Sequence, residues 1–144
     1  MSITLLTTEQ VIDLQSSTLP NSGEPHMDKL EGALFRVQTL IDYENCEDVF
    51  LLAAMYLVGI AKAHAFHDAN KRTAFQAASV FLMLNGFELN RSFELVKLTV
   101  MAAMNEADIE STRFALMILS DYRDELMDGY EEDDYLPQNA EENS

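Results

Sequence analysis

The strongest constraint on the fold is an apolar run of 13 residues that extends from Val49 to Ala61. A helix of this length rises about 20 Å, which is shorter than the roughly 30 Å hydrocarbon core of a bilayer. The run is apolar almost all the way round a helix, as is typical of a helix enclosed by others. We therefore expect a globular domain built around a central helix from about Glu47 to His64.

The composition favours helices around that central one. Of the 144 residues, 48% are hydrophobic, and the chain has five glycines, three prolines and no tryptophan. This length suits one domain, and this composition suits a folded chain rich in helix formers. No convincing strand pattern or internal repeat occurs. The expected fold is therefore all-α with about six helices.

Two capping patterns predict where the first two helices begin. Thr7 and Gln10 have the spacing of a capping box, and so do Asp28 and Glu31, with apolar residues at helical spacing after each pair. We expect the second helix to end before residues 39–45, which are interpreted as a short extended connector.

The remaining helices are predicted from their end signals. The fourth is expected from about Ala69 to Leu84, because Asn85 and Gly86 form a typical helix stop. Ser92 is expected to cap a fifth helix that continues to about Asn105. A sixth is expected from about Ile109 to Met127.

Charge divides the chain into a body and a tail and argues against two classes of partner. The formal net charge is −16, so neither nucleic acid nor an anionic membrane is expected as a partner. Residues 129–144 hold six acids and no base, which predicts a disordered tail, while residues 1–128 form the domain with a charge of −10.

Cys46 is the single cysteine, and no leader or membrane span is evident, so we expect a cytoplasmic protein.

Cations gather at one place in this acidic chain, at the stretch HAFHDANKR, residues 64–72. Lys62, Lys71 and Arg72 place three of the nine bases within eleven residues. Asp68 is a natural N-cap, so residues 69–71 would form the first turn of the fourth helix. The free N–H groups and the positive dipole end of that turn favour an anion, and Arg72 suits two phosphate oxygens.

Two further side chains at this junction could act as a base and as a metal ligand. His64 is placed to take a proton from a hydroxyl, and Asp68 can help to hold a magnesium ion that bridges phosphates. Taken singly, each residue has a simpler interpretation: a helix cap for His64 or Asp68, a solvated pair for Lys71 and Arg72, and an exposed side chain for His67. Together they favour a site that handles phosphoryl groups.

At these residues the sequence resembles the Fic/Doc superfamily, and within it the death-on-curing (Doc) toxins. Their pattern H-x-F-x-[DN]-[AG]-N-K-R matches residues 64–72 at every fixed position. The similarity extends to EGALFRVQ at residues 31–38, to ASVFLMLNG at residues 78–86 and to residues 95–102. It covers about residues 1–125 and leaves out the acidic tail.

The resemblance implies an all-α Fic fold with a central helical hairpin that carries the motif. It implies a magnesium- and ATP-dependent enzyme that modifies a protein hydroxyl, with His64 as general base and Asp68 beside the metal. Asn70, Lys71 and Arg72 would bind phosphates together with the backbone from Ala69 onward, and Phe66 would anchor the loop. It also implies a translation protein, elongation factor Tu, as substrate, and an antitoxin as partner.

Departures from the wider Fic pattern H-P-F-x-[DE]-G-N-G-R-x-x-R bear on which group is transferred. Lys71 replaces the second glycine, and Phe75 replaces the last arginine. Both changes favour phosphate transfer, the Doc activity, over transfer of AMP. The chain has no Ser/Thr-x-x-x-Glu-Gly/Asn inhibitory segment, so inhibition is expected to need a partner.

Three other interpretations stay open from the sequence. An adenylyltransferase would use nearly the same residues, and an inactive Fic-like module would bind a nucleotide or a partner without chemistry. An HD-domain phosphohydrolase would use the His67-Asp68 doublet with His26, but it leaves Asn70, Lys71 and Arg72 unexplained.

Overall fold

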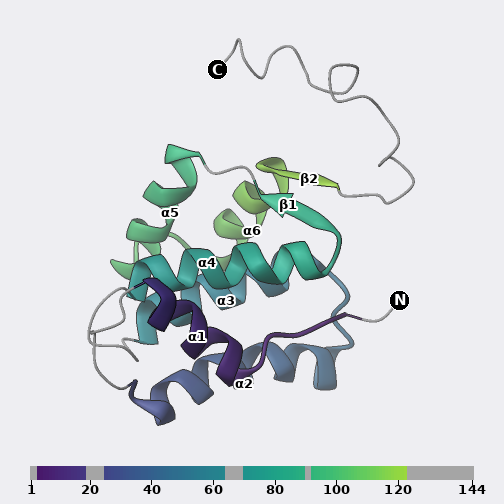
Figure 1. Ribbon diagram of the computed structural model, residues 1–144. Coiled ribbons are helices and arrows are strands. Elements are labelled where there is room, and N and C mark those ends of the chain that lie inside the picture. Colours follow the sequence, from purple (N-terminus) through teal and green to yellow (C-terminus); the bar gives the residue numbers. More distant parts are fainter. Residues whose placement is uncertain (1–2, 19–24, 64–69, 90–91, 123–144) are drawn as a thin grey trace.

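The computed structural model describes residues 3–18, 25–63, 70–89 and 92–122. Within these ranges the chain forms six helices and a pair of short strands, and the predicted all-α class is confirmed (Figure 1). The helices are α1 (Thr8–Thr18), α2 (Met27–Glu44), α3 (Val49–Ala63), α4 (Asn70–Leu84), α5 (Phe93–Ala103) and α6 (Ile109–Ile118). The strands are β1 (Phe87–Leu89) and β2 (Ser120–Tyr122). The predicted tail, residues 129–144, lies outside the described residues.

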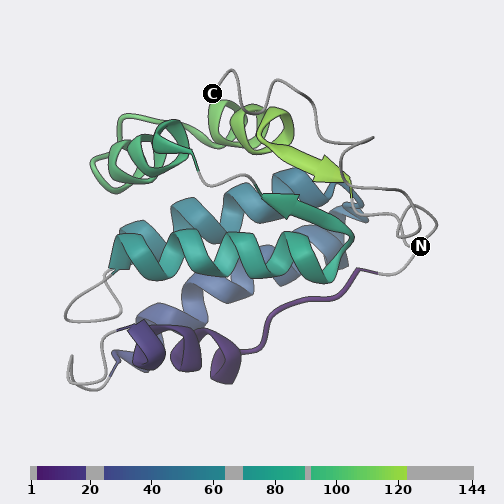
Figure 2. The ribbon, with the colours of Figure 1, turned by 45° about the horizontal axis from the view of Figure 1, so that its top comes forward.

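Helix α3 is the centre of the domain, as its apolar run predicts. It packs against α2, α4, α5 and α6, and Leu52, Leu57 and Ile60 are completely buried. Figure 2 shows α1 and α2 on one side of the α3–α4 pair and α5 and α6 on the other. No helix within the described ranges has the length and apolar character needed to cross a membrane.

The N-terminal segment is fastened to the α3–α4 pair by its backbone. The predicted capping box closes at α1, where Thr7 N–H donates to Gln10 Oε1 (2.8 Å) and Gln10 N–H donates to Thr7 Oγ1 (3.1 Å). Upstream, Leu6 N–H donates to the buried hydroxyl of Tyr56 on α3 (3.0 Å). Thr4 exchanges two hydrogen bonds with the side chain of Asn85, just after α4 (2.8 and 2.9 Å).

Helix α2 differs from the prediction at both ends. It begins at Met27, and His26 caps it without a side-chain hydrogen bond, so the Asp28–Glu31 spacing does not form a capping box. The connector predicted at residues 39–45 is wrong, because the helix continues to Glu44 and ends at the left-handed Asn45 (φ 52°). Leu40 and Ile41 pack against the core, and this burial keeps the last turn helical.

An acidic cap and an ion pair fix the start of α3. Asp48 Oδ1 accepts the N–H groups of Phe50 and Leu51 (3.0 and 3.2 Å), and its Oδ2 accepts Nε of Arg113 on α6 (2.6 Å). Partial burial alone would raise the pKa of this carboxyl. The Arg113 bond and charge and the two N–H groups outweigh that burial, so the pKa of Asp48 is lowered.

The strand pair was not predicted, and it shortens the last helix. Helix α6 ends at Ile118 instead of near Met127, and residues 120–122 pair antiparallel with residues 87–89. Three-residue strands are too short for an alternating pattern to show in the sequence. The other end signals are confirmed: Gly86 has a positive φ of 99°, and Ser92 Oγ accepts Leu95 N–H (3.2 Å) at the start of α5, which ends at Ala103.

Candidate active site

The α3–α4 hairpin holds both ends of the junction that carries the motif. Helices α3 and α4 pack against each other, and the small residues Ala61, Ala74 and Ala77 of these two helices are completely buried. Farther along the hairpin the rings of Tyr56 and Phe81 lie 4.9 Å apart between centroids. The end of α3 and the start of α4 are therefore fixed by a well-packed core.

The first turn of α4 presents two cations to solvent. Lys71 and Arg72 are exposed, whereas the next two residues, Thr73 and Ala74, are completely buried. Neither cation forms an ion pair with any other residue in the described ranges. The helix start adds its own positive dipole end and free N–H groups. This end of the hairpin is therefore suited to an anionic group.

Several residues of the predicted site cannot be placed beside these two. His64, Asp68 and Ala69 lie outside the described residues, and so do Phe66 and His67. Asn70 is the first described residue of α4, but its side chain is not among those described. The roles expected for these residues, including the Asp68 cap and the base at His64, stay predictions.

Metal ligands are sparse in the described part of the chain. Those residues include no group of three or more His, Cys, Asp or Glu side chains able to hold a metal ion. The described cations at the start of α4 fit the phosphates of a nucleotide. The carboxylate that the sequence predicts beside a magnesium ion, Asp68, lies outside the described residues, so this role stays a prediction.

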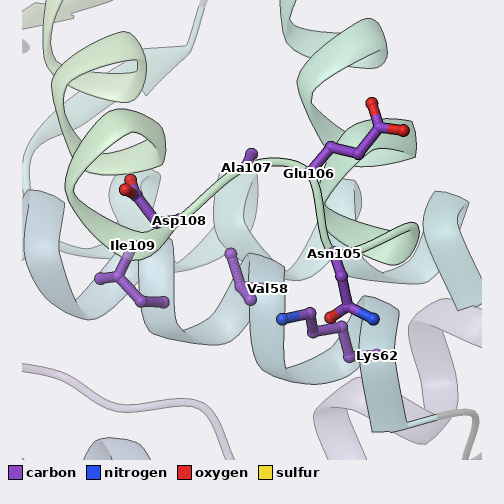
Figure 3. Close-up of a pocket in the computed structure, with 7 residues that line it drawn as sticks. All are labelled: Val58, Lys62, Asn105, Glu106, Ala107, Asp108 and Ile109. Carbon is purple, nitrogen blue, oxygen red and sulfur yellow. The ribbon is translucent and has the colours of Figure 1, made fainter.

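Lys62, the cation that precedes the motif, lines a pocket of its own among the described residues. It lies near the end of α3 and lines a pocket of about 340 Å³ between α3 and the connector from α5 to α6 (Figure 3). The other lining residues are Val58, Asn105, Glu106, Ala107, Asp108 and Ile109. Lys71 and Arg72 are not part of this lining.

The connector residues of this pocket were not predicted as functional. The sequence contains only indirect signals for them, because Asp108 precedes the sixth predicted helix and Asn105 is the predicted end of the fifth. In the structure Asn105 adopts a left-handed conformation (φ 64°), and Asp108 caps α6 by accepting the N–H of Ser111 (2.8 Å). A charged residue near a helix end does not by itself predict a pocket, because the lining residues come together only in the folded chain.

Comparison with known proteins gives matches over the same hairpin. Residues 5–82, which include the whole motif, match the Fic/DOC family. The chain is 43% identical over 93 residues to "Protein kinase doc" of Escherichia phage P1, a match that covers 65% of this chain and 72% of that protein. It is 46% identical over 43 residues to "Toxin Doc" of Mycolicibacterium smegmatis, over 30% of this chain and 33% of that protein.

Proposed function

The chain belongs to the Fic/DOC family, and we propose that it is a Doc-type toxin that transfers phosphate from ATP to a protein hydroxyl. The proposed acceptor is a Ser or Thr of a translation protein, elongation factor Tu by resemblance, and its modification would stop growth. The name of the phage P1 relative, a protein kinase, supports phosphate as the transferred group.

The observation that carries this proposal is the pair of exposed cations, Lys71 and Arg72, on the first turn of α4. In a chain of net charge −16, cations without a described partner are unusual at a helix start that already favours anions. Phosphate oxygens satisfy both the cations and the first-turn N–H groups. The same arrangement has no role in an HD-type metal site.

The proposed reaction needs one base and a clamp for phosphates. The acceptor oxygen attacks the γ-phosphorus of ATP while its proton passes to the imidazole of His64. The bond from the γ-phosphorus to the bridging β–γ oxygen breaks, and ADP leaves. Lys71 and Arg72 hold phosphate oxygens and offset the negative charge that shifts to the leaving group.

Magnesium is the proposed companion of ATP. Bound with Asp68, it would supply positive charge to the phosphates. Asn70 and the backbone from Ala69 are the proposed contacts to those phosphates.

Intact-mass measurement of the candidate substrate tests this function directly. Elongation factor Tu is incubated with the protein, ATP and magnesium, and a gain of one phosphoryl group is expected. A gain of one adenylyl group would mean attack at the α-phosphorus with release of pyrophosphate. That result would replace the kinase by an adenylyltransferase.

Variants of the motif separate the proposed roles. His64→Ala is expected to abolish transfer, and unchanged transfer would remove His64 as the base. Lys71→Gly tests whether this side chain selects the transferred group, and Lys71→Ala is its control. Both remove the side chain, but only glycine adds a helix cost of about 1 kcal/mol. If Lys71 selects the group, both variants change the product from phosphate toward AMP.

A cognate antitoxin is the proposed partner that restrains this activity. The relatives named as Doc proteins support it, because one of them carries the word toxin in its name. Expression of the chain alone should arrest growth, and co-expression with its antitoxin should restore it.

A further inference from the structure

We propose that the pocket around Lys62 is a specificity site that binds a carboxylate side chain of the protein substrate. This inference rests on the proposed function, since it concerns how that function chooses its acceptor. The pocket lies beside the α3–α4 junction, because Lys62 precedes the last described residue of α3 by one position. A substrate residue held there would be near the α3–α4 junction, where the sequence predicts the base His64.

The base of the pocket offers a cationic hydrogen-bond donor. In Figure 3 the ammonium group of Lys62 lies below the connector, and the carboxamide of Asn105 descends toward the Lys62 side chain with its nitrogen on the side away from that ammonium group. Val58 from α3 and Ala107 from the connector are buried members of the lining. A carboxylate accepts charge-assisted hydrogen bonds from an ammonium group.

The two acidic residues of the lining leave this position open. Asp108 is occupied as the cap of α6, where its carboxylate accepts Ser111 N–H, and this bond lowers its pKa. Glu106 points away from Lys62 in the view of Figure 3, and neither acid forms an ion pair with Lys62. Within the described part of the chain the ammonium group of Lys62 has no ion-pair partner, so it can pair with a ligand.

The size of the pocket points to a side chain. A volume of about 340 Å³ lies at the lower end of the range of roughly 300–1,000 Å³ for small-ligand sites. It accommodates one or two residues of a peptide and is small for a whole nucleotide.

Steady-state kinetics with elongation factor Tu and ATP test the site. For Lys62→Gln we expect the KM for the protein substrate to rise roughly tenfold, with kcat and the KM for ATP within about twofold of wild type. Lys97→Gln is the matched control, because Lys97 is an exposed cation of α5 outside the pocket. A raised KM for ATP would assign Lys62 to the nucleotide, and an unchanged KM for the protein would overturn the proposal.

A binding measurement keeps the test independent of catalysis. Two capped tetrapeptides, Gly-Asp-Thr-Gly and Gly-Asn-Thr-Gly, are titrated into the 15N-labelled protein and followed by NMR. The Asp peptide should shift the amide signals of residues 105–109 more than the Asn peptide does, and Lys62→Gln should remove this difference. Equal shifts, or no shift, would overturn the proposal even if the enzyme transfers phosphate. Absence of transfer by wild type would instead refute the proposed function alone.

Discussion

The hydroxyl of Tyr56 provides a sharp test of how the N-terminal segment is held. Tyr56 is 2% exposed, and its oxygen accepts the N–H of the buried residue Leu6. Tyr56→Phe keeps the ring against Phe81 but leaves that N–H without an acceptor. A buried polar group that loses its partner costs about 1–3 kcal/mol. For a chain of 144 residues, this loss corresponds to a fall in Tm of ~3–10 °C.

Urea unfolding followed by circular dichroism measures this free energy, with Tyr43→Phe as the matched control. Tyr43 is 79% exposed on α2, so the same loss of a hydroxyl should change stability by less than about 0.5 kcal/mol. Equal effects of the two variants, or no loss for Tyr56→Phe, would refute the reasoning that the Leu6 bond matters.

The pH dependence of stability at alkaline pH gives a second test of the Tyr56 hydroxyl. Burial raises the pKa of Tyr56 to about 12, and the bond from Leu6 opposes this only in part. In the unfolded chain the phenol ionises near pH 10. Between about pH 10 and pH 12 the folded protein therefore keeps the phenol proton of Tyr56, whereas the unfolded chain loses it. The stability that the protonated hydroxyl contributes is complete below about pH 10 and is lost as the pH rises toward 12. The advantage of wild type over Tyr56→Phe should shrink by up to ~2.7 kcal/mol across this range, and a constant difference would contradict the assignment.

Three further predictions concern other buried contacts. Asp48→Asn should destabilise the fold by about 1–2 kcal/mol at pH 7, by urea unfolding, because it weakens the pair with Arg113. Since the pKa of Asp48 is lowered in the fold, the stability that this carboxyl adds is present above about pH 4 and lost as the pH falls further, so wild type and variant should converge in acid. Thr73→Val should raise the Tm by a few degrees, because Thr73 Oγ1 is buried without a hydrogen-bond partner; a lower Tm would show that the hydroxyl is bonded after all. Ala77→Leu should cost about 1–3 kcal/mol by overpacking the core around the buried residue Ala77 of α4, and it should lower transfer more than Ala77→Ser does; equal transfer by the two variants would show that transfer does not depend on this packing.

The sequence predicted those parts of the fold that depend on local rules. The apolar run placed α3 at the centre, the Thr7–Gln10 box opened α1, and Ser92 capped α5. Similar signals were misleading where packing decided. Asp28 and Glu31 had the spacing of a capping box, yet α2 begins one residue earlier, and the burial of Leu40 and Ile41 extends it through the predicted connector.

The candidate site was predictable in its composition but not in its spatial grouping. The motif placed Lys71 on the first turn of α4, as observed, with Arg72 directly after it. Lys62 lies close to them in sequence, but it lines a pocket completed by residues more than 40 positions later in the chain. No local pattern connects Lys62 with Asn105, because only the packing of α5 and α6 against α3 brings them together.

The pairing of β1 with β2 joins the two ends of the segment that contains α5 and α6. This feature bears on how that segment can vary between proteins of the family. The pairing places residues 87–89 beside residues 120–122. The segment that contains α5, the connector and α6 therefore begins and ends at the same place on the molecule. The match to the Fic/DOC family ends at residue 82, just before this excursion begins. A segment whose two ends meet can be replaced as a cassette with little strain on its anchor points. We therefore expect that exchange of the connector that faces Lys62 would alter the proposed choice of acceptor while the α3–α4 hairpin stays as it is.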